Sequence, residues 1–326
     1  MPTQTRSDGR AGFGADDGRR PKPRFTSGRE CWVFSVSRPD ELPGYHPELI
    51  GGLLEPGESL HYLLYTPLYE ASAAPFGVRG HPGSHALAVT DTRFLLSRDP
   101  HRDGAGRSAR AIPFDRVLRV ELGHALVLAW MVIHFAESDR VESETVFFRS
   151  SGSHHLQAAV RAFRSRKAPE LSLHADEAWR AACARSPLYL RDDLPRIVLE
   201  GEPTLEVVRS SERWGGDGRG RRRAPRCVSP AGIAALSPRA LFVAQSESPS
   251  RPGGLAFGVN ATAVERAAIR RCGMETGSRS GTDVARLLVD VGDREAFERL
   301  ELPFDEESAC AAERLMALLS GAVVRS

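Results

Sequence analysis

Short runs of alternating hydrophobic and polar residues dominate the chain from about residue 53 onward, separated by glycine, proline and aspartate. A period of two is typical of strands that bury one face. In the first half the pattern predicts strands at residues 59–66, 86–90, 94–97, 111–114, 117–122, 126–135 and 145–149. In the second half it predicts strands at 204–209, 233–236, 240–244, 255–259, 287–291 and 297–302, with a less regular region around 264–269. We therefore expect a mainly β protein.

Each series of strands is followed by a segment with helical periodicity. Apolar residues recur at intervals of three and four at Leu156, Ala159, Val160 and Phe163, and again at Ala312, Leu315, Met316 and Leu319. Asp305 is placed to cap the last helix, and Glu306 and Glu307 suit the positive end of its dipole. The pattern predicts an α+β fold in which each strand series ends in one helix.

The same order of elements occurs twice, which indicates a tandem duplication of a β-rich unit of domain size. We expect a disordered tail at residues 1–30, a first unit at 45–167, a connecting helix and linker at 168–200, and a second unit at 201–322. The tail lacks hydrophobic periodicity and is rich in glycine and arginine, so it cannot bury enough apolar surface to fold. One large mixed domain is the alternative.

One stretch of the first unit carries a family resemblance. The sequence VTDTRFLL at residues 89–96, followed by IPFDRVLRVE at 112–121 and a long apolar strand, resembles the bacterial PH-like and GRAM-like families. In the second unit the matching positions read Ser237-Pro238-Arg239-Ala240, so its membership follows from element order alone. The resemblance implies two tandem PH-like barrels, each of about seven antiparallel strands capped by a C-terminal helix. It also implies binding and not catalysis.

Composition removes several classes of active site. The 326 residues carry 44 basic and 42 acidic side chains, a formal charge of +2, which gives the whole molecule no strong field toward nucleic acid or membrane. The only lysines, Lys22 and Lys167, do not follow a glycine, so no Walker-type phosphate loop is present. There is no G-x-S-x-G and no H-E-x-x-H. We expect no enzyme activity, no cofactor and no metal; an enzyme of unrecognised type is the alternative.

A basic segment is the most pointed candidate for a binding site. Residues 217–226, together with a nearby tryptophan, supply the candidate anion- or partner-binding side chains Arg219, Arg221, Arg222, Arg223, Arg226 and Trp214. We expect a protein partner. Anionic lipid and nucleic-acid phosphate are alternatives, because arginines attract both and tryptophan can stack on bases. A solvated loop without function is the simplest alternative. Sheet edges offer a further route, either to a partner strand or to a homo-oligomer.

Cysteine spacing and the N-terminal sequence bear on the compartment. The five cysteines are far apart and nowhere form C-x-x-C, so we expect them to be reduced. The N-terminal residues contain no apolar signal region, and the longest apolar run, 125–136, is shorter than the roughly 20 residues that cross a bilayer. Cytoplasmic localisation is expected. His81 and His85 lie in a glycine- and proline-rich loop, where their spacing does not indicate a metal site.

Overall fold

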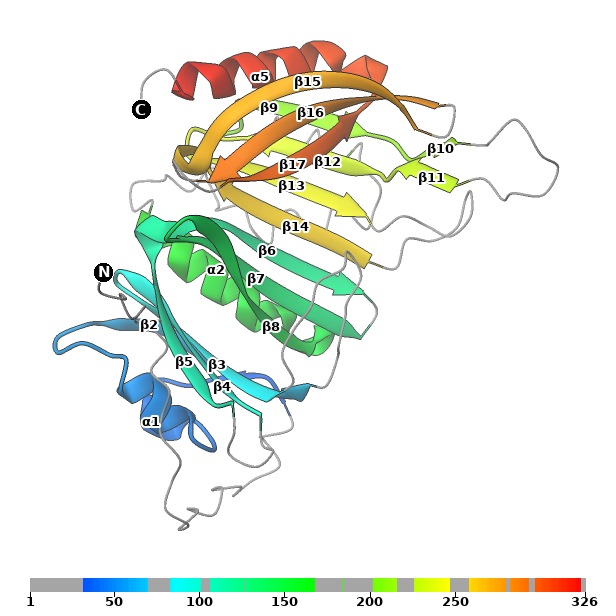
Figure 1. The fold of residues 1–326 in the computed structure, drawn as a ribbon. Coiled ribbons are helices and arrows are strands. Elements are labelled where there is room, and N and C mark those ends of the chain that lie inside the picture. The colour runs from blue at the N-terminus through cyan, green and yellow to red at the C-terminus, as the bar shows by residue number, and fades with distance from the viewer. Residues whose placement is uncertain are drawn as a thin grey trace, which may run out of the picture.

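The structure is a computed structural model that describes residues 32–69, 83–100, 106–125, 127–167, 184, 202–215, 226–246, 258–279, 282–292 and 297–323. The protein is mainly β, with several antiparallel sheets and a few helices, as the alternating pattern predicts (Figure 1). No helix in these ranges is long and apolar enough to cross a bilayer.

The first half contains two series of strands and a closing helix. The segment before the first long strand holds β1 (Phe34–Ser35), the 3-10 turn η2 (Pro39–Glu41) and α1 (His46–Gly51). The first series is β2 (Leu60–Tyr69), β3 (Gly83–Thr90), β4 (Arg93–Asp99) and β5 (Ser108–Pro113), which forms a sheet with β1 in chain order. The turn η4 (Phe114–Arg116) leads to β6 (Val117–Ala125), β7 (Leu128–Glu137) and β8 (Arg140–Arg149). The turn η5 (Ser150–Gly152) and α2 (Ser153–Lys167) follow.

The second half follows the same plan. Its first series is β9 (Glu206–Ser210), β12 (Gly232–Leu236), β13 (Ala240–Ser246) and β14 (Gly258–Glu265). A hairpin of β10 (Arg213–Gly215) and β11 (Arg226–Ser229) is inserted between β9 and β12. The turn η7 (Arg266–Ala268) leads to β15 (Ile269–Arg279), β16 (Thr282–Gly292) and β17 (Phe297–Phe304), and η8 (Glu306–Ser308) leads to α5 (Ala309–Val323).

The halves also share local details that sequence identity does not show. In the turn between β3 and β4, the hydroxyl of Thr90 accepts a hydrogen bond from the Arg93 amide at 3.2 Å. In the turn between β12 and β13, the hydroxyl of Ser237 accepts one from the Ala240 amide at 2.9 Å. A serine or threonine at the first position of such a turn satisfies amides that the ladder leaves free. Thr90 and Ser237 are therefore equivalent positions.

A second shared detail is a bulge at the start of the fifth strand. In the first half the register between β6 and β7 shifts between Val117 and Arg119, directly after η4. In the second half the register between β15 and β16 shifts between Ile269 and Arg271, directly after η7. A bulge adds a residue to one strand and bends it. The two fifth strands, β6 and β15, are thus equivalent down to the residue.

The two halves are joined through one continuous sheet. Strand β14 of the second half pairs antiparallel with β6 of the first, with Ala261 opposite Leu122. The result is a seven-stranded sheet in the order β8-β7-β6-β14-β13-β12-β9, which runs through the centre of the molecule (Figure 1). Pairing of two edge strands satisfies amides and carbonyls that would otherwise stay open. The expected pair of separately closed barrels is not shown among the described strands, because this pairing merges one sheet from each half.

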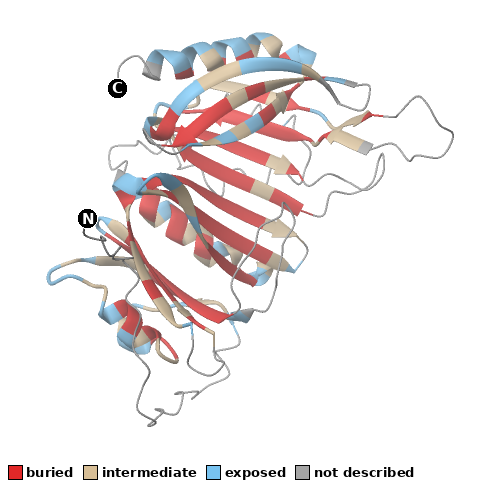
Figure 2. Ribbon diagram, viewed as in Figure 1, coloured by how far each residue is buried: buried red, intermediate tan, exposed pale blue. Residues whose placement is uncertain are grey.

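Both faces of the central sheet are buried by apolar packing, and Figure 2 shows most of its strands as buried. On β13, Phe242 belongs to the apolar cluster that includes Phe163 of α2, whereas its neighbour Val243 belongs to the cluster of Leu287 and Leu315. Strands β15–β17 and α5 therefore cover one face of the second half, and α2 lies on the other. Successive side chains of a strand point to opposite faces, so a strand buried on both sides is apolar throughout.

The structure corrects several predictions made from the sequence, and others concern residues that it does not describe. Asp305 precedes η8 but makes no capping bond; its carboxylate instead accepts hydrogen bonds from the amide of Ser211 at 2.8 and 2.9 Å. Strands β1, β10, β11 and β15 and helix α1 were not predicted from the pattern. The expected tail at 1–30 lies outside the described residues, as does the expected linker at 168–200 apart from position 184, which is helical.

Candidate functional site

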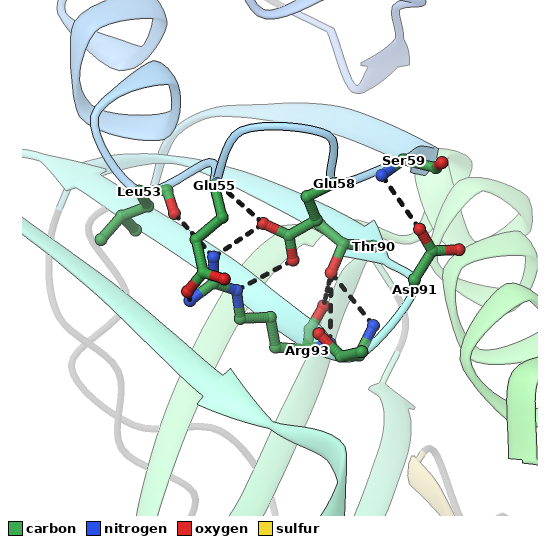
Figure 3. A network of polar contacts seen from close by, with 8 residues as sticks. Leu53, Glu55, Glu58, Ser59, Thr90, Asp91 and Arg93 are labelled. Atoms are coloured by element: carbon green, nitrogen blue, oxygen red, sulfur yellow. Dashed lines mark hydrogen bonds and ion pairs between the residues drawn. The ribbon is translucent and has the colours of Figure 1, made fainter.

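The turn that carries the family resemblance is held by a network of charges (Figure 3). The guanidinium of Arg93 donates to both carboxylate oxygens of Glu58, at 2.9 and 2.7 Å, and lies 2.8 Å from a carboxylate oxygen of Glu55. This hydrogen bonding from Arg93 lowers the pKa of Glu58 to about 2. The hydroxyl of Thr90 makes the local bonds within the turn, while Asp91 accepts from the amide of Ser59 at 3.0 Å. The network ties the β3–β4 turn to residues 53–59, which is a structural task.

The equivalent turn of the second half contacts a buried ion pair that joins the halves. Arg164 of α2 donates to both carboxylate oxygens of Glu202, each at 2.8 Å, and the two side chains are 3% and 0% exposed. Ser237 donates to the same carboxylate at 2.6 Å. The guanidinium carbon of Arg164 also lies 4.5 Å from the ring centroid of Phe242. Charge pairing and a fixed hydroxyl therefore hold α2 of the first half against the second half.

The basic segment proposed from the sequence lies largely outside the described residues. Arg219, Arg221, Arg222 and Arg223 belong to the undescribed range 216–225, and the backbone of Arg226 begins β11. Trp214 on β10 is half-buried, and its indole nitrogen donates to the carboxylate of Glu212. Arg226 is paired opposite Gly215 in the β10–β11 hairpin.

A cluster that the sequence did not single out lies where the two halves meet. Arg119 and Glu121 on β6 and His134 on β7 share one face of the central sheet, and Glu298 of β17 reaches them from above. Arg119 pairs with Glu121 and, at 2.8 Å, with Glu298. Asn260 of β14 donates to Glu121 at 3.1 Å. We call these five residues the charged seam. It joins two strands of the first half, β6 and β7, to two of the second, β14 and β17, and Arg119 and Glu121 at its centre are buried.

The histidine of the charged seam is held between opposite charges. Its Nε2 atom lies 3.2 Å from a carboxylate oxygen of Glu121, and its Nδ1 atom lies 3.4 Å from Nη2 of Arg119. Burial, and then the positive charge of Arg119, lower the pKa of His134 to about 3. The imidazole is therefore neutral at physiological pH. His134 is therefore an uncharged member of the ionic network.

An open groove of about 560 Å³ lies beside the charged seam, between the β7–β8 hairpin and the start of β17. Its lining comprises His134, Asp139, Arg140, Val141, Ser143, Phe297 and Glu298. Phe297, at the edge of this groove, is 63% exposed. A groove with an exposed aromatic ring and charges of both signs suits a mixed polar and apolar surface of a partner.

The groove brings a serine beside a histidine, which raises the question of nucleophilic catalysis. Ser143 on β8 is paired opposite His134 on β7. A serine nucleophile needs a ring nitrogen of the histidine to take its proton. Here one ring nitrogen faces Glu121 and the other lies near Arg119 and Glu298. Nδ1 lies beside Arg119, Nε2 has no hydrogen-bond partner among the described residues, and a pKa of about 3 makes the ring a weak base. The arrangement favours a salt network over a catalytic triad.

The described histidines and cysteines show no cluster with the donors for a metal. No group of three or more histidine, cysteine, aspartate or glutamate side chains gathers at one point within the described ranges. His85 is buried on β3, and His81 lies outside the described residues. Cys227, Cys272 and Cys310 are free thiols, and the other two cysteines lie outside these ranges.

Comparison with known proteins leaves the family open. No protein-family model matches the chain, and no curated protein matches it. The resemblance to PH-like and GRAM-like families therefore stays a prediction that depends on the residues of the β3–β4 turn and on the order of elements.

Proposed function

We propose that the chain is a non-catalytic binding protein built from two PH-like units in tandem, and that its ligand is another protein. The repetition of four strands, a 3-10 turn, three strands and a helix in both halves supports this proposal most directly. That order is what the resemblance of residues 89–96 and 112–121 implies. The equivalent hydroxyls of Thr90 and Ser237 extend it to the second unit, where the sequence motif is absent.

The way the units are joined supports an adaptor role. Pairing of β6 with β14 and the buried Arg164–Glu202 pair fix one unit against the other. Two binding surfaces held at a fixed distance and angle present a preorganised platform, which saves the ordering entropy that a flexible pair would lose on binding. The open groove beside Phe297 and the sheet edges that no described strand covers supply surfaces of the kind that proteins recognise.

Anionic lipid or nucleic-acid phosphate is the second candidate ligand, because the sequence places five arginines in residues 217–226. Each arginine near an anionic leaflet contributes about 1 kcal/mol. Such binding weakens steeply with salt, whereas a protein interface with an apolar centre is less sensitive.

The test compares these ligands on the full chain. Sedimentation with phosphatidylserine-containing vesicles and retention of single-stranded RNA are measured at low and physiological salt, beside affinity capture followed by titration of any captured protein in purified form. The variant changes Arg219, Arg221, Arg222, Arg223 and Arg226 to Gln, and the same five positions changed to Lys keep the charge as the matched control. The proposal expects a saturable protein complex that both variants retain. Vesicle or RNA binding that the Gln variant loses and the Lys variant keeps would assign the function to phosphate recognition. Turnover of any substrate would overturn the non-catalytic assignment.

A further inference from the structure

The internal repetition allows two equivalent sheet edges of this molecule to be compared. Strands β6 and β15 are equivalent, because each follows a 3-10 turn and each carries the same bulge against the next strand. The edge of β6 is occupied by β14, an antiparallel strand. Strand β15 is the edge of the three-stranded sheet, and no described strand pairs with its other side. It lies at the outer rim of the molecule beside α5 (Figure 1). Among the described strands, one of two equivalent edges is therefore filled and the other has no partner strand.

The exposure of the side chains differs between the paired edge of β6 and the edge of β15. On β6, Leu122 lies opposite Ala261 of β14 and is only 9% exposed. Counting from the shared bulge, Met274 occupies the same position on β15, and it is 39% exposed. A large apolar side chain on a strand is normally covered by its neighbours across the ladder. Met274 is left uncovered where its counterpart is buried by a paired strand.

Helix α5 borders this edge and defines its inner wall. The thiol of Cys272, two residues before Met274, lies 3.2 Å from the hydroxyl of Ser320 and 3.6 Å from the carbonyl oxygen of Met316. In the first half, the small side chain of Ala261 on β14 and Gln157 of α2 line one small cavity. A strand that pairs with this edge therefore directs small side chains toward the helix. On β14 these are Val259, Ala261 and Ala263, which alternate with Asn260, Thr262 and Val264.

A second copy of this chain does not fit that place. Within the chain, the face of the second unit that bears Phe242 packs in one cluster with α2. The equivalent face of the first unit bears Leu95 and Ala88, and Ile50 of α1 packs there instead. A second copy that offered its β5 to β15, as β14 is offered to β6, would place α5 where α1 already lies. The N-terminal helix therefore excludes stacking of copies through these edges.

We infer that the open edge of β15, with Met274 exposed on it and α5 beside it, binds an extended segment of a partner protein as an added antiparallel strand. The segment carries small apolar side chains at alternate positions, as β14 does, and polar ones between them. This inference rests on the proposed function, since it names the surface by which the binding protein holds a protein ligand.

The test uses a fluorescein-labelled peptide with the sequence of β14, residues 258–265, titrated with the full chain and followed by fluorescence anisotropy. Saturable binding to the wild type is expected. Met274→Lys should weaken it at least tenfold, Met274→Leu should keep it because leucine stands at the equivalent position of β6, and Leu205→Lys controls for a lysine at another exposed apolar site. Met274 is partly exposed, so its variants should fold, and their urea midpoints verify this.

Backbone pairing is tested separately from side-chain contact. Only every second amide of an added strand faces its neighbour. Of two peptides N-methylated on alternate residues, one should lose binding and the other should retain it. Absence of binding to the wild type, equal binding by Met274→Lys, or equal binding of both methylated peptides would each overturn the inference. Self-association that Met274→Lys abolishes would name a second copy as occupant and overturn it as well.

The result also separates this inference from the proposed function. A protein partner that binds wild type and Met274→Lys equally would refute the β15 edge and leave the binding role intact. Failure of the peptide together with failure to find any protein ligand would refute both.

Discussion

Replacing Arg164 with methionine tests whether a buried charge holds the two halves together. The substitution keeps most of the aliphatic volume that packs over Phe242, since methionine is long and adaptable. It removes the guanidinium that donates twice to the carboxylate of Glu202, which is fully buried, while the Ser237 hydroxyl still donates to that carboxylate. Removal of one partner of a buried ion pair costs about 3–5 kcal/mol. We expect the free energy of unfolding to fall by that amount.

The measurement is urea unfolding followed by tryptophan fluorescence and far-UV circular dichroism. The matched control combines Arg164→Met with Glu202→Leu, which removes both charges and should recover at least half of the loss, because an uncharged pair of similar volume has no desolvation cost. A loss below about 1 kcal/mol in the single variant, where a surface ion pair would fall, contradicts the reasoning. A double variant no more stable than the single one contradicts it equally.

Three further predictions concern stability. Glu58→Gln should be less stable than wild type above pH 4.5, and the difference should disappear as pH falls through about 2. Arg93 lowers the pKa of Glu58, so protonation of this carboxylate removes the stability that its bonds with Arg93 give the wild type. Urea midpoints measured across this pH range check the prediction. Gly123→Ala should cost about 1–3 kcal/mol, because a Cβ atom there would overlap the indole of Trp130, and Trp130→Leu in the same chain should reduce that cost in thermal unfolding. Ser237→Ala should lower the free energy of unfolding by roughly 1–3 kcal/mol, because it removes a hydrogen bond of 2.6 Å to the fully buried carboxylate of Glu202; a urea midpoint equal to that of wild type would contradict this.

Alternation in the sequence was a good guide wherever one face of a strand is apolar and the other is not. The predicted strands 59–66 and 240–244 correspond to Leu60–Tyr69 and Ala240–Ser246, and the closing helix follows the last strand as expected. Strand β15 was missed because its sequence, IRRCGMETGSR, has no clear alternation. Its outer face is charged and its inner face is covered only in part, since Met274 on it stays exposed. A strand without a fully buried face leaves little periodic signal.

The contacts that organise the molecule could not be predicted from local pattern. Several edge strands were expected, and nothing in β6 or β14 says that these two pair with each other. In the charged seam, alternation separates Arg119 from the apolar residues of its strand, but its partner Glu298 lies 179 residues further along the chain. A charge in a strand is read as solvent-facing when its partner is that distant. In the motif at residues 89–96, the side chain that bonds the backbone of the turn is the hydroxyl of Thr90, which local pattern does not single out.

The shared central sheet means that the chain cannot be divided between its two halves without exposing buried strand edges. If either half were produced separately, the backbone amides and carbonyls on one edge of β6 or β14 would lose their partners. Apolar side chains that the other half covers would be exposed to water. Such fragments should aggregate when produced alone and should fold when they are mixed, as in fragment complementation. The two halves therefore depend on each other for folding and form a single cooperative unit.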